Sequence, residues 1–222
     1  MSRLGQTSLE PLEPYDGKLS CTVLRGESPQ KGADLLDIPP NGGKLQPIRI
    51  KEMRTIEDMK LELLSDDSNR FIQALIDYDI NSKDKYGSNL LHYYIMNYKS
   101  IVHPAGVIIP EFVKKGLDIN EKRKDGRTAL YLSVQYQLKG IFELLLNHNA
   151  DIDMQNANGN TPLWEAVMQY KGDGFFIEHL LKNGANPDIE NNNGVSPKSL
   201  ARTIANYDVR RFFNNDNKQQ TD

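Results

Sequence analysis

The sequence predicts an all-α repeat fold: a solenoid of paired antiparallel helices joined by long turns, with a non-repeat N-terminal extension. Two observations predict it. Four segments of the chain resemble one another, and each contains a turn glycine, namely Gly87, Gly126, Gly159 and Gly194. The intervals between these glycines are 39, 33 and 35 residues. Self-similarity at such a period is the signature of stacked units that each contact only their neighbours.

Each unit carries the signals of two helices. Thr128 and Thr161 follow turn glycines and stand where a helix N-cap is expected. Pro162 and Pro197 come next to such caps, at first-turn positions where a missing N–H costs nothing. The second helical runs end at residues that can adopt the left-handed conformation: Gly116, Asn149 and Gly184.

This pattern resembles the ankyrin-repeat family. The motifs T-A-L-Y at 128–131 and T-P-L-W at 161–164 are similar to the family's T-P-L-H, and N-L-L-H at 89–92 keeps its last two residues. The resemblance implies a repeat domain over residues 51–222. Its expected parts are a capping unit at about 55–77, repeats at about 79–117, 118–150 and 151–185, a C-terminal capping unit with both helices at 186–213, and a polar tail at 214–222.

Residues 1–50 do not fit the repeat. They hold six of the eleven prolines and a short strand-like run, LSCTVL. This extension is compatible with a docking arm, a small hairpin or partial disorder, and the sequence assigns it no function.

Composition narrows the classes of partner. The net charge of −3 gives no argument for nucleic acid or an acidic membrane surface. Cys21 is the only cysteine, so no intramolecular disulfide can form. No run approaches the ~18 apolar residues of a membrane span, and the first residues do not resemble a signal peptide. We therefore expect a cytoplasmic protein, although a removed signal peptide is compatible with the same sequence.

The stretch ADIDMQNANGNTPLWEAV at 150–167 raises the question of a calcium loop. Counting from Asp151 or Asp153 places no glycine at position six and no glutamate at position twelve. The four histidines lack zinc-site spacing, and His92 takes the motif position whose imidazole, by the resemblance, ties turns together. No nucleophile elbow, P-loop or dinucleotide fingerprint is present. We predict no catalytic, metal or cofactor site and no small-molecule substrate.

The resemblance implies that partners bind along the turns and the first helices, which line a concave surface. The corresponding residues flank each turn glycine or stand late in each first helix: Lys85, Tyr86, Ser88, Met96, Asn97, Lys124, Asp125, Arg127, Gln135, Tyr136, Asn158, Asn160, Met168 and Gln169. Trp164, at the histidine position, fits either core packing or ligand contact. The basic run EKRKDGR at 121–127 fits either a solvated tip or an acidic partner.

Two insertions offer a competing surface. Extra residues around 99–107 and 171–174 separate the two helices of their units, and such insertions map to loops on one face of a stack. Neutral variation of a surface loop explains them equally well.

The first functional hypothesis is a non-enzymatic module that binds one specific protein. The final unit resembles small bacterial ankyrin proteins of the toxin-immunity type, which implies a cognate toxin that is neutralised by occlusion. The alternative is a secreted effector or regulatory adaptor that tethers a host or housekeeping protein. A third hypothesis is an enzyme whose active residues converge in the N-terminal segment.

Overall fold

The computed structural model describes residues 35–37, 46–48, 53–204 and 208–214, and the chain divides into two compact units, Met1–Lys51 and Glu52–Asp222. In the first unit, strands β1 (Leu35–Asp37) and β2 (Gln46–Ile48) pair antiparallel, with Leu35 opposite Ile48. The run LSCTVL lies outside the described residues.

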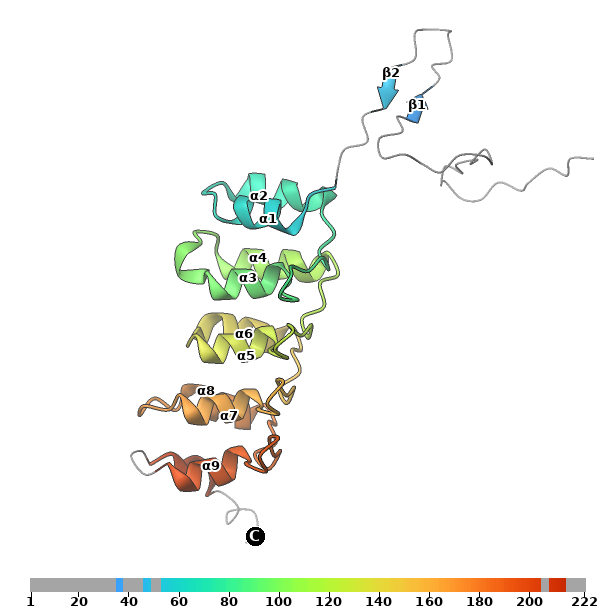
Figure 1. The fold of residues 1–222 in the computed structure, drawn as a ribbon. Coiled ribbons are helices and arrows are strands. Elements are labelled where there is room, and N and C mark those ends of the chain that lie inside the picture. The colour runs from blue at the N-terminus through green and yellow to red at the C-terminus, as the bar shows by residue number, and fades with distance from the viewer. Residues whose placement is uncertain (1–34, 38–45, 49–52, 205–207, 215–222) are drawn as a thin grey trace, which may run out of the picture. The chain divides into compact units, whose positions relative to one another are not determined.

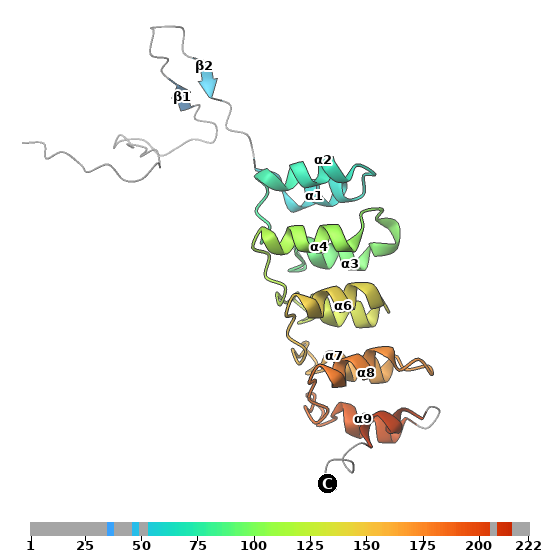
Figure 2. The ribbon, with the colours of Figure 1, turned by 180° about the vertical axis from the view of Figure 1, so that it is seen from behind.

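The second unit is a stack of helix pairs, as the sequence predicts (Figure 1). The first helices of the pairs form one row and the second helices form another, which Figure 2 shows from behind. The elements, in chain order, are α1 (Ile56–Leu63), α2 (Ser68–Ala74), η1 (Leu75–Asp77), α3 (Leu90–Met96), η2 (Tyr98–Ser100), α4 (Ala105–Lys114), α5 (Ala129–Gln135), α6 (Lys139–Asn147), α7 (Pro162–Met168), α8 (Phe175–Lys182), α9 (Pro197–Thr203) and η3 (Val209–Phe213).

Side-chain caps set the start of every first helix. Thr128 accepts a hydrogen bond from the Tyr131 N–H, and Thr161 accepts one from the Trp164 N–H, both at 3.2 Å. Thr55, Asn89 and Ser196 cap α1, α3 and α9 in the same way. Each cap satisfies one of the N–H groups that a helix start leaves without a partner. The predicted caps are therefore confirmed.

Left-handed residues end the long second helices. Gly116, Asn149 and Gly184 have φ of 83°, 60° and 90°. After Asn149, the Ala150 N–H donates to the carbonyl of Leu145 at 3.0 Å, which closes the end of α6. The predicted helix stops are correct at all three places.

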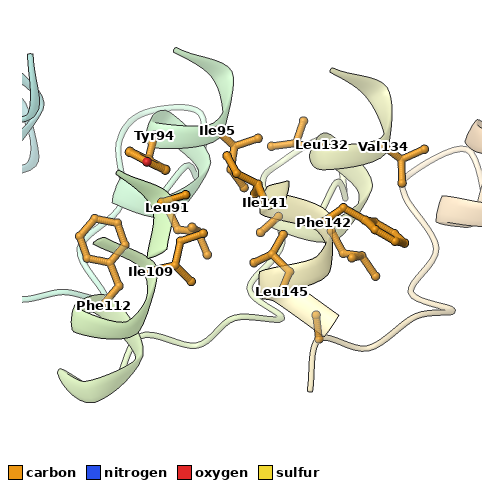
Figure 3. Close-up of a cluster of buried hydrophobic side chains, with 14 of the residues drawn as sticks. Leu91, Tyr94, Ile95, Ile109, Phe112, Leu132, Val134, Ile141, Phe142 and Leu145 are labelled. Atoms are coloured by element: carbon orange, nitrogen blue, oxygen red, sulfur yellow. The ribbon is translucent and has the colours of Figure 1, made fainter. Parts of the chain in front are cut away.

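The core runs without a break through the stack. Leu91, Ile109 and Phe112 of one unit are fully or almost fully buried, as are Phe142 and Leu145 of the next. Figure 3 shows Ile95 of α3 and Ile109 of α4 facing Leu132 of α5 and Leu145 of α6. Phe112 packs instead on Phe71 of the preceding unit, with ring centroids 6.1 Å apart, and Phe142 packs on Phe176 of the following unit, at 5.2 Å. Since each unit buries its apolar face against a neighbour, no unit has a complete core of its own.

The insertion at 99–107 packs against the stack. His103 is 1% exposed, its ring stacks on Phe71 at 5.3 Å, and its Nδ1 is 2.7 Å from the Ser68 hydroxyl oxygen. The Tyr94 hydroxyl donates to the His103 carbonyl at 2.7 Å, and Ile101 is also buried. The segment is therefore anchored at its centre, and only part of it forms a free loop.

The C-terminal unit differs from the prediction that it keeps both helices. Its first helix, α9, is present, but the described residues after it form the five-residue 3₁₀ helix η3 in place of a second α-helix. This short helix covers the last apolar face, because Val209 is fully buried and the Phe212 ring packs edge-on to Tyr170 at 5.6 Å. Arg202, Arg210 and Arg211 are exposed, as expected.

Candidate partner-binding surface

Backbone hydrogen bonds join the turn tips into a ladder. The Lys124 N–H donates to the Tyr86 carbonyl, the Ala157 N–H to the Asp125 carbonyl, and the Asn192 N–H to the Asn158 carbonyl, each at 3.0 Å. The turn glycines allow this close approach, because a Cβ on Gly126 would lie 2.5 Å from the Ala157 nitrogen. The ladder holds the turns of successive units in a fixed register.

Carboxylate and amide oxygens inside the turns accept hydrogen bonds from backbone N–H groups. Asn156 Oδ1 accepts from the N–H groups of Asn158 and Asn160 at 2.9 and 3.0 Å. Both oxygens of Asp153 lie 3.1 Å from the Asn186 nitrogen, and burial raises the pKa of Asp153. These oxygens hold turns together. Among the described residues, no group of three or more His, Cys, Asp or Glu is arranged to hold a metal ion.

The fourteen residues predicted to contact a partner differ in exposure. Six are exposed: Lys85, Tyr86, Lys124, Tyr136, Asn158 and Met168. Six are half-buried: Met96, Asn97, Asp125, Arg127, Gln135 and Gln169.

The remaining two residues, Ser88 and Asn160, are buried, with only 1% and 8% of their surface exposed. The prediction that they lie on the open surface is therefore corrected. The Ser88 N–H donates to Asp84 inside its turn, and Asn160 Oδ1 accepts from the Asn191 amide of the next unit at 2.8 Å. Both residues take part in hydrogen bonds that stabilise turns, and neither is available to contact a partner.

Arg127 connects a turn to the end of the helix that follows it. Its guanidinium donates to Gln135 Oε1 and to Asp125 Oδ2, both at 2.7 Å. Burial would raise the pKa of Asp125, but the bonds from Arg127 outweigh it and the pKa is lowered. The neighbouring Arg123 reaches back to the previous unit, where its Nη1 lies 3.0 Å from the Met96 sulfur. Turn and helix residues thus share one continuous surface.

A hollow of about 270 Å³ lies beside α3 and the end of α5. Three predicted residues line it, namely Met96, Asn97 and Tyr136. The rest of the wall includes Ile95, Tyr98 and Leu138, which the sequence did not identify because the hollow forms only where two units meet. Lys99 and Ser100 complete a lining that is partly polar, and the apolar part of the wall suits one apolar side chain of a partner.

A buried carboxylate lies under the next part of the surface. Glu165 is 8% exposed and accepts hydrogen bonds from the Tyr131 hydroxyl at 2.8 Å and the Gln169 amide at 3.0 Å. Burial and the charge of Glu165 raise the pKa of Tyr131. Tyr131 stands at the motif-histidine position of its unit, and its hydroxyl contacts Glu165 of the following unit.

His92 ties two turns together, as the resemblance implies. Its Nδ1 accepts from the Asn89 N–H, and its Nε2 donates to the Glu121 carbonyl at 3.1 Å. Burial, with the nearby Arg123 charge, lowers the pKa of His92 to about 4. Trp164 at the same motif position is half-buried.

The basic run at 121–127 is largely engaged inside the stack. Glu121 pairs with Lys83 at 2.7 Å, and Lys122 donates to the Gln155 carbonyl at 2.7 Å. Arg123 and Arg127 are half-buried. Lys124 is the exposed member whose ammonium has no hydrogen bond or ion pair within the described residues. The run therefore presents much less free positive charge than its composition indicates.

Comparison with known proteins agrees with this architecture. A sequence model of ankyrin repeats in three copies matches residues 63–153 and 105–193, together more than half of the chain. The chain belongs to the ankyrin-repeat family.

Its relatives are diverse. An ankyrin repeat protein of variola virus is 32% identical over 142 residues, which cover 62% of this chain and 25% of the relative. The human neurogenic locus notch homolog protein 1 is 30% identical over 137 residues, 62% of this chain and 5% of the relative. An intracellular phospholipase A2 of Caenorhabditis elegans is 27% identical over 135 residues, 58% of this chain and 12% of the relative. The aligned region thus spans a quarter or less of these proteins.

No helix in the described part of the chain is long and apolar enough to cross a membrane.

Proposed function

We propose that this chain is a non-enzymatic module that binds one specific protein through its concave surface. The concave surface consists of the twelve residues, of the fourteen predicted to contact a partner, that are exposed or half-buried. One observation carries the proposal. Tyr86, Tyr136 and Met168 are 56%, 43% and 50% exposed, and they come from three successive units. Large aromatic and thioether side chains are the type that dominates protein interfaces.

The fixed geometry of the surface supports this role. The ladder between turns and the Arg127 bonds to Asp125 and Gln135 hold the surface in place before a partner arrives. A prearranged surface loses less conformational entropy on binding than a flexible one. The hollow beside Met96 and Tyr136 gives a partner's apolar side chain a defined place to enter.

Site-specific photocrosslinking tests the proposal. A photoreactive amino acid would be placed at position 86, 136 or 168, and the protein would be irradiated in cells that naturally produce it. We expect all three positions to capture the same protein. Matched controls at Val107 on α4 and Ile76 in η1, which are 43% and 64% exposed, should capture little of it. Capture from the control positions alone would contradict the concave surface.

The narrower hypotheses concern the class of partner. The relatives described above come from viruses and animals, so they lend no support to a bacterial immunity protein acting on a toxin. Tethering of a host or housekeeping protein requires nothing beyond the same surface. The crosslinked protein would distinguish the two, because a toxin would be inhibited by binding and a tethered protein would not. The hypothesis of an enzyme within residues 1–50 falls mainly on residues that the structure does not describe.

A further inference from the structure

The C-terminal end of the stack carries a second candidate site, which shares no residue with the concave surface. A hollow of about 560 Å³ lies among α8, α9 and η3, and a smaller one of about 260 Å³ adjoins it. Lys198 and Phe213 line both. The two hollows together form what we call the C-terminal cleft.

Positive charge is concentrated around this cleft. Five cations line it: Lys182, Lys198, Arg202, Arg210 and Arg211. Glu178 is the only carboxylate in the described lining, and Lys198 lies 4.0 Å from Asp188. The other four cations are exposed and form no ion pair within the described part of the chain. In a chain of net charge −3, this is a local field that would attract an anion.

The wall of the cleft also has an apolar part. Leu181, Phe212 and Phe213 line the larger hollow. Phe212 is held in place by Tyr170, whose ring centroid lies 5.6 Å away, and by the close approach of its ring to Gly174. The Arg211 guanidinium lies 4.8 Å from the centroid of the same ring. A cation and a fixed aromatic ring are thus presented together.

We propose that the C-terminal cleft binds an acidic peptide segment of a protein, in which an apolar side chain is flanked by carboxylates. The apolar side chain packs against Phe212 and Phe213, and the carboxylates pair with Arg210, Arg211 and Lys182. Guanidinium groups suit this task because they bind carboxylates through two parallel hydrogen bonds. A single-stranded nucleic acid also supplies negative charge, and its bases stack on exposed aromatic rings. The Arg211 guanidinium already lies over the Phe212 ring, however, and the chain as a whole, with a net charge of −3, repels a long polyanion.

The test uses the full chain and a fluorescein-labelled peptide of four glutamates around one leucine, followed by fluorescence anisotropy. We expect saturable binding that weakens about tenfold or more when ionic strength rises from about 0.05 to 0.3 M. The same peptide with glutamines in place of glutamates should bind at least about tenfold more weakly, because its charge is lost. Absence of saturable binding by the acidic peptide would overturn the proposal.

Charge-reversal variants locate the binding. Arg210→Glu combined with Arg211→Glu should weaken the acidic peptide by about tenfold or more. Lys99→Glu combined with Lys114→Glu removes the same charge from exposed positions elsewhere and should change the affinity by less than about twofold. Lys182→Glu should also weaken binding. Because Lys182 lies on α8, a loss of affinity in this variant could not come from a folding defect in η3.

Two outcomes would overturn the assignment. Equal weakening by both double variants would mean that the peptide responds only to net charge. Tighter binding of a single-stranded oligothymidylate than of the peptide would identify the ligand as nucleic acid. Neither result bears on the concave surface, whose crosslinks arise from other residues.

Discussion

Single residues with positive φ determine where each unit reverses direction. Asn149 stands where the neighbouring units use glycine, and its φ of 60° shows that it serves the same purpose. This position could be predicted, because the repeat aligns it with Gly116 and Gly184. The left-handed conformation of Gln137, whose φ is 58°, could not be predicted. No glycine or asparagine marks it, and its conformation follows from the short connection between α5 and α6.

Substitutions at these two positions test the backbone directly. Asn149→Gly and Gln137→Gly should be neutral or stabilising, because glycine adopts this conformation without a steric cost. Asn149→Val should lower the free energy of unfolding by about 1–2 kcal/mol, since a β-branched side chain is strained there. Urea denaturation would measure all three. Equal stability of the glycine and valine variants would show that Asn149 does not need positive φ.

His92 should make stability depend on pH. Its folded pKa of about 4 lies below the ordinary value of 6.5, so the unfolded chain binds more protons between these values. The free energy of unfolding therefore has its full value above pH 6.5. It decreases as pH falls toward 4, by about 3 kcal/mol in total, because protonation of His92 favours the unfolded chain. His92→Gln keeps an N–H donor for the Glu121 carbonyl and should lack this loss. Urea midpoints from pH 7.5 to 4.5 would test it, and a parallel decline in parent and variant would contradict the assignment.

At the scale of elements, helix starts could be predicted because a cap is local to its helix. Thr128 and Thr161 identify α5 and α7 from a few neighbouring residues. The burial of Asn160 depends instead on Asn191 of the next unit, and that of His103 on Phe71 and Ser68 of the previous one. Unlike the contact of the motif histidine His92, these two contacts between units have no sequence signature in a single chain. The burial of Asn160 therefore could not be predicted from its position beside a turn glycine.

Leu145 tests the register of a second helix. Its side chain is fully buried between units, so Leu145→Ala should lower the free energy of unfolding by about 2–5 kcal/mol. Glu143→Ala is a matched control in the same helix, because Glu143 is exposed, and it should change stability by less than about 0.5 kcal/mol. Comparison of urea midpoints separates packing from helix propensity. Equal effects of the two substitutions would place the buried face of α6 elsewhere.

At the scale of the whole molecule, the ladder of turns couples one unit to the next. Gly126 and Gly116 both have positive φ, but only a Cβ on Gly126 would meet the backbone of a neighbouring turn, at 2.5 Å from the Ala157 nitrogen. Gly116→Ala should therefore lose only the conformational term, about 1–2 kcal/mol. Gly126→Ala should lose about 1–3 kcal/mol more, because the turns must move apart. Thermal or urea unfolding of both variants checks the difference, and equal losses would mean that the turns adjust freely.

The shape of the candidate partner-binding surface could be predicted only in part, because part of it forms at contacts between units. The repeat period places turn and first-helix residues on one face, and most of the predicted residues are exposed or half-buried there. The hollow beside Met96 and Tyr136 and the C-terminal cleft arise where separate elements meet. Their shape depends on side-chain packing between units, which a single sequence does not reveal.

Affinity for the partner should depend on a few residues of the concave surface. Tyr86→Ala, Tyr136→Ala and Met168→Ala remove exposed side chains and should leave stability within about 0.5 kcal/mol of the parent. At least one of the three should weaken binding by about 2 kcal/mol or more, mainly through faster dissociation. Arg127→Ala is less suitable, since it also breaks the bonds to Asp125 and Gln135.

Once crosslinking has identified the partner, dissociation rates measured with the unmodified partner decide between the concave surface and the insertion at 99–107. Deleting residues 99–106 would remove the buried Ile101 and His103 and so damage the stack. Val102→Ala is the better probe, because Val102 is 66% exposed within the same insertion. Binding through the concave surface predicts that Val102→Ala dissociates like the parent while a tyrosine or methionine variant dissociates faster. If Val102→Ala alone accelerates dissociation, the insertion is the binding element and the concave surface is not.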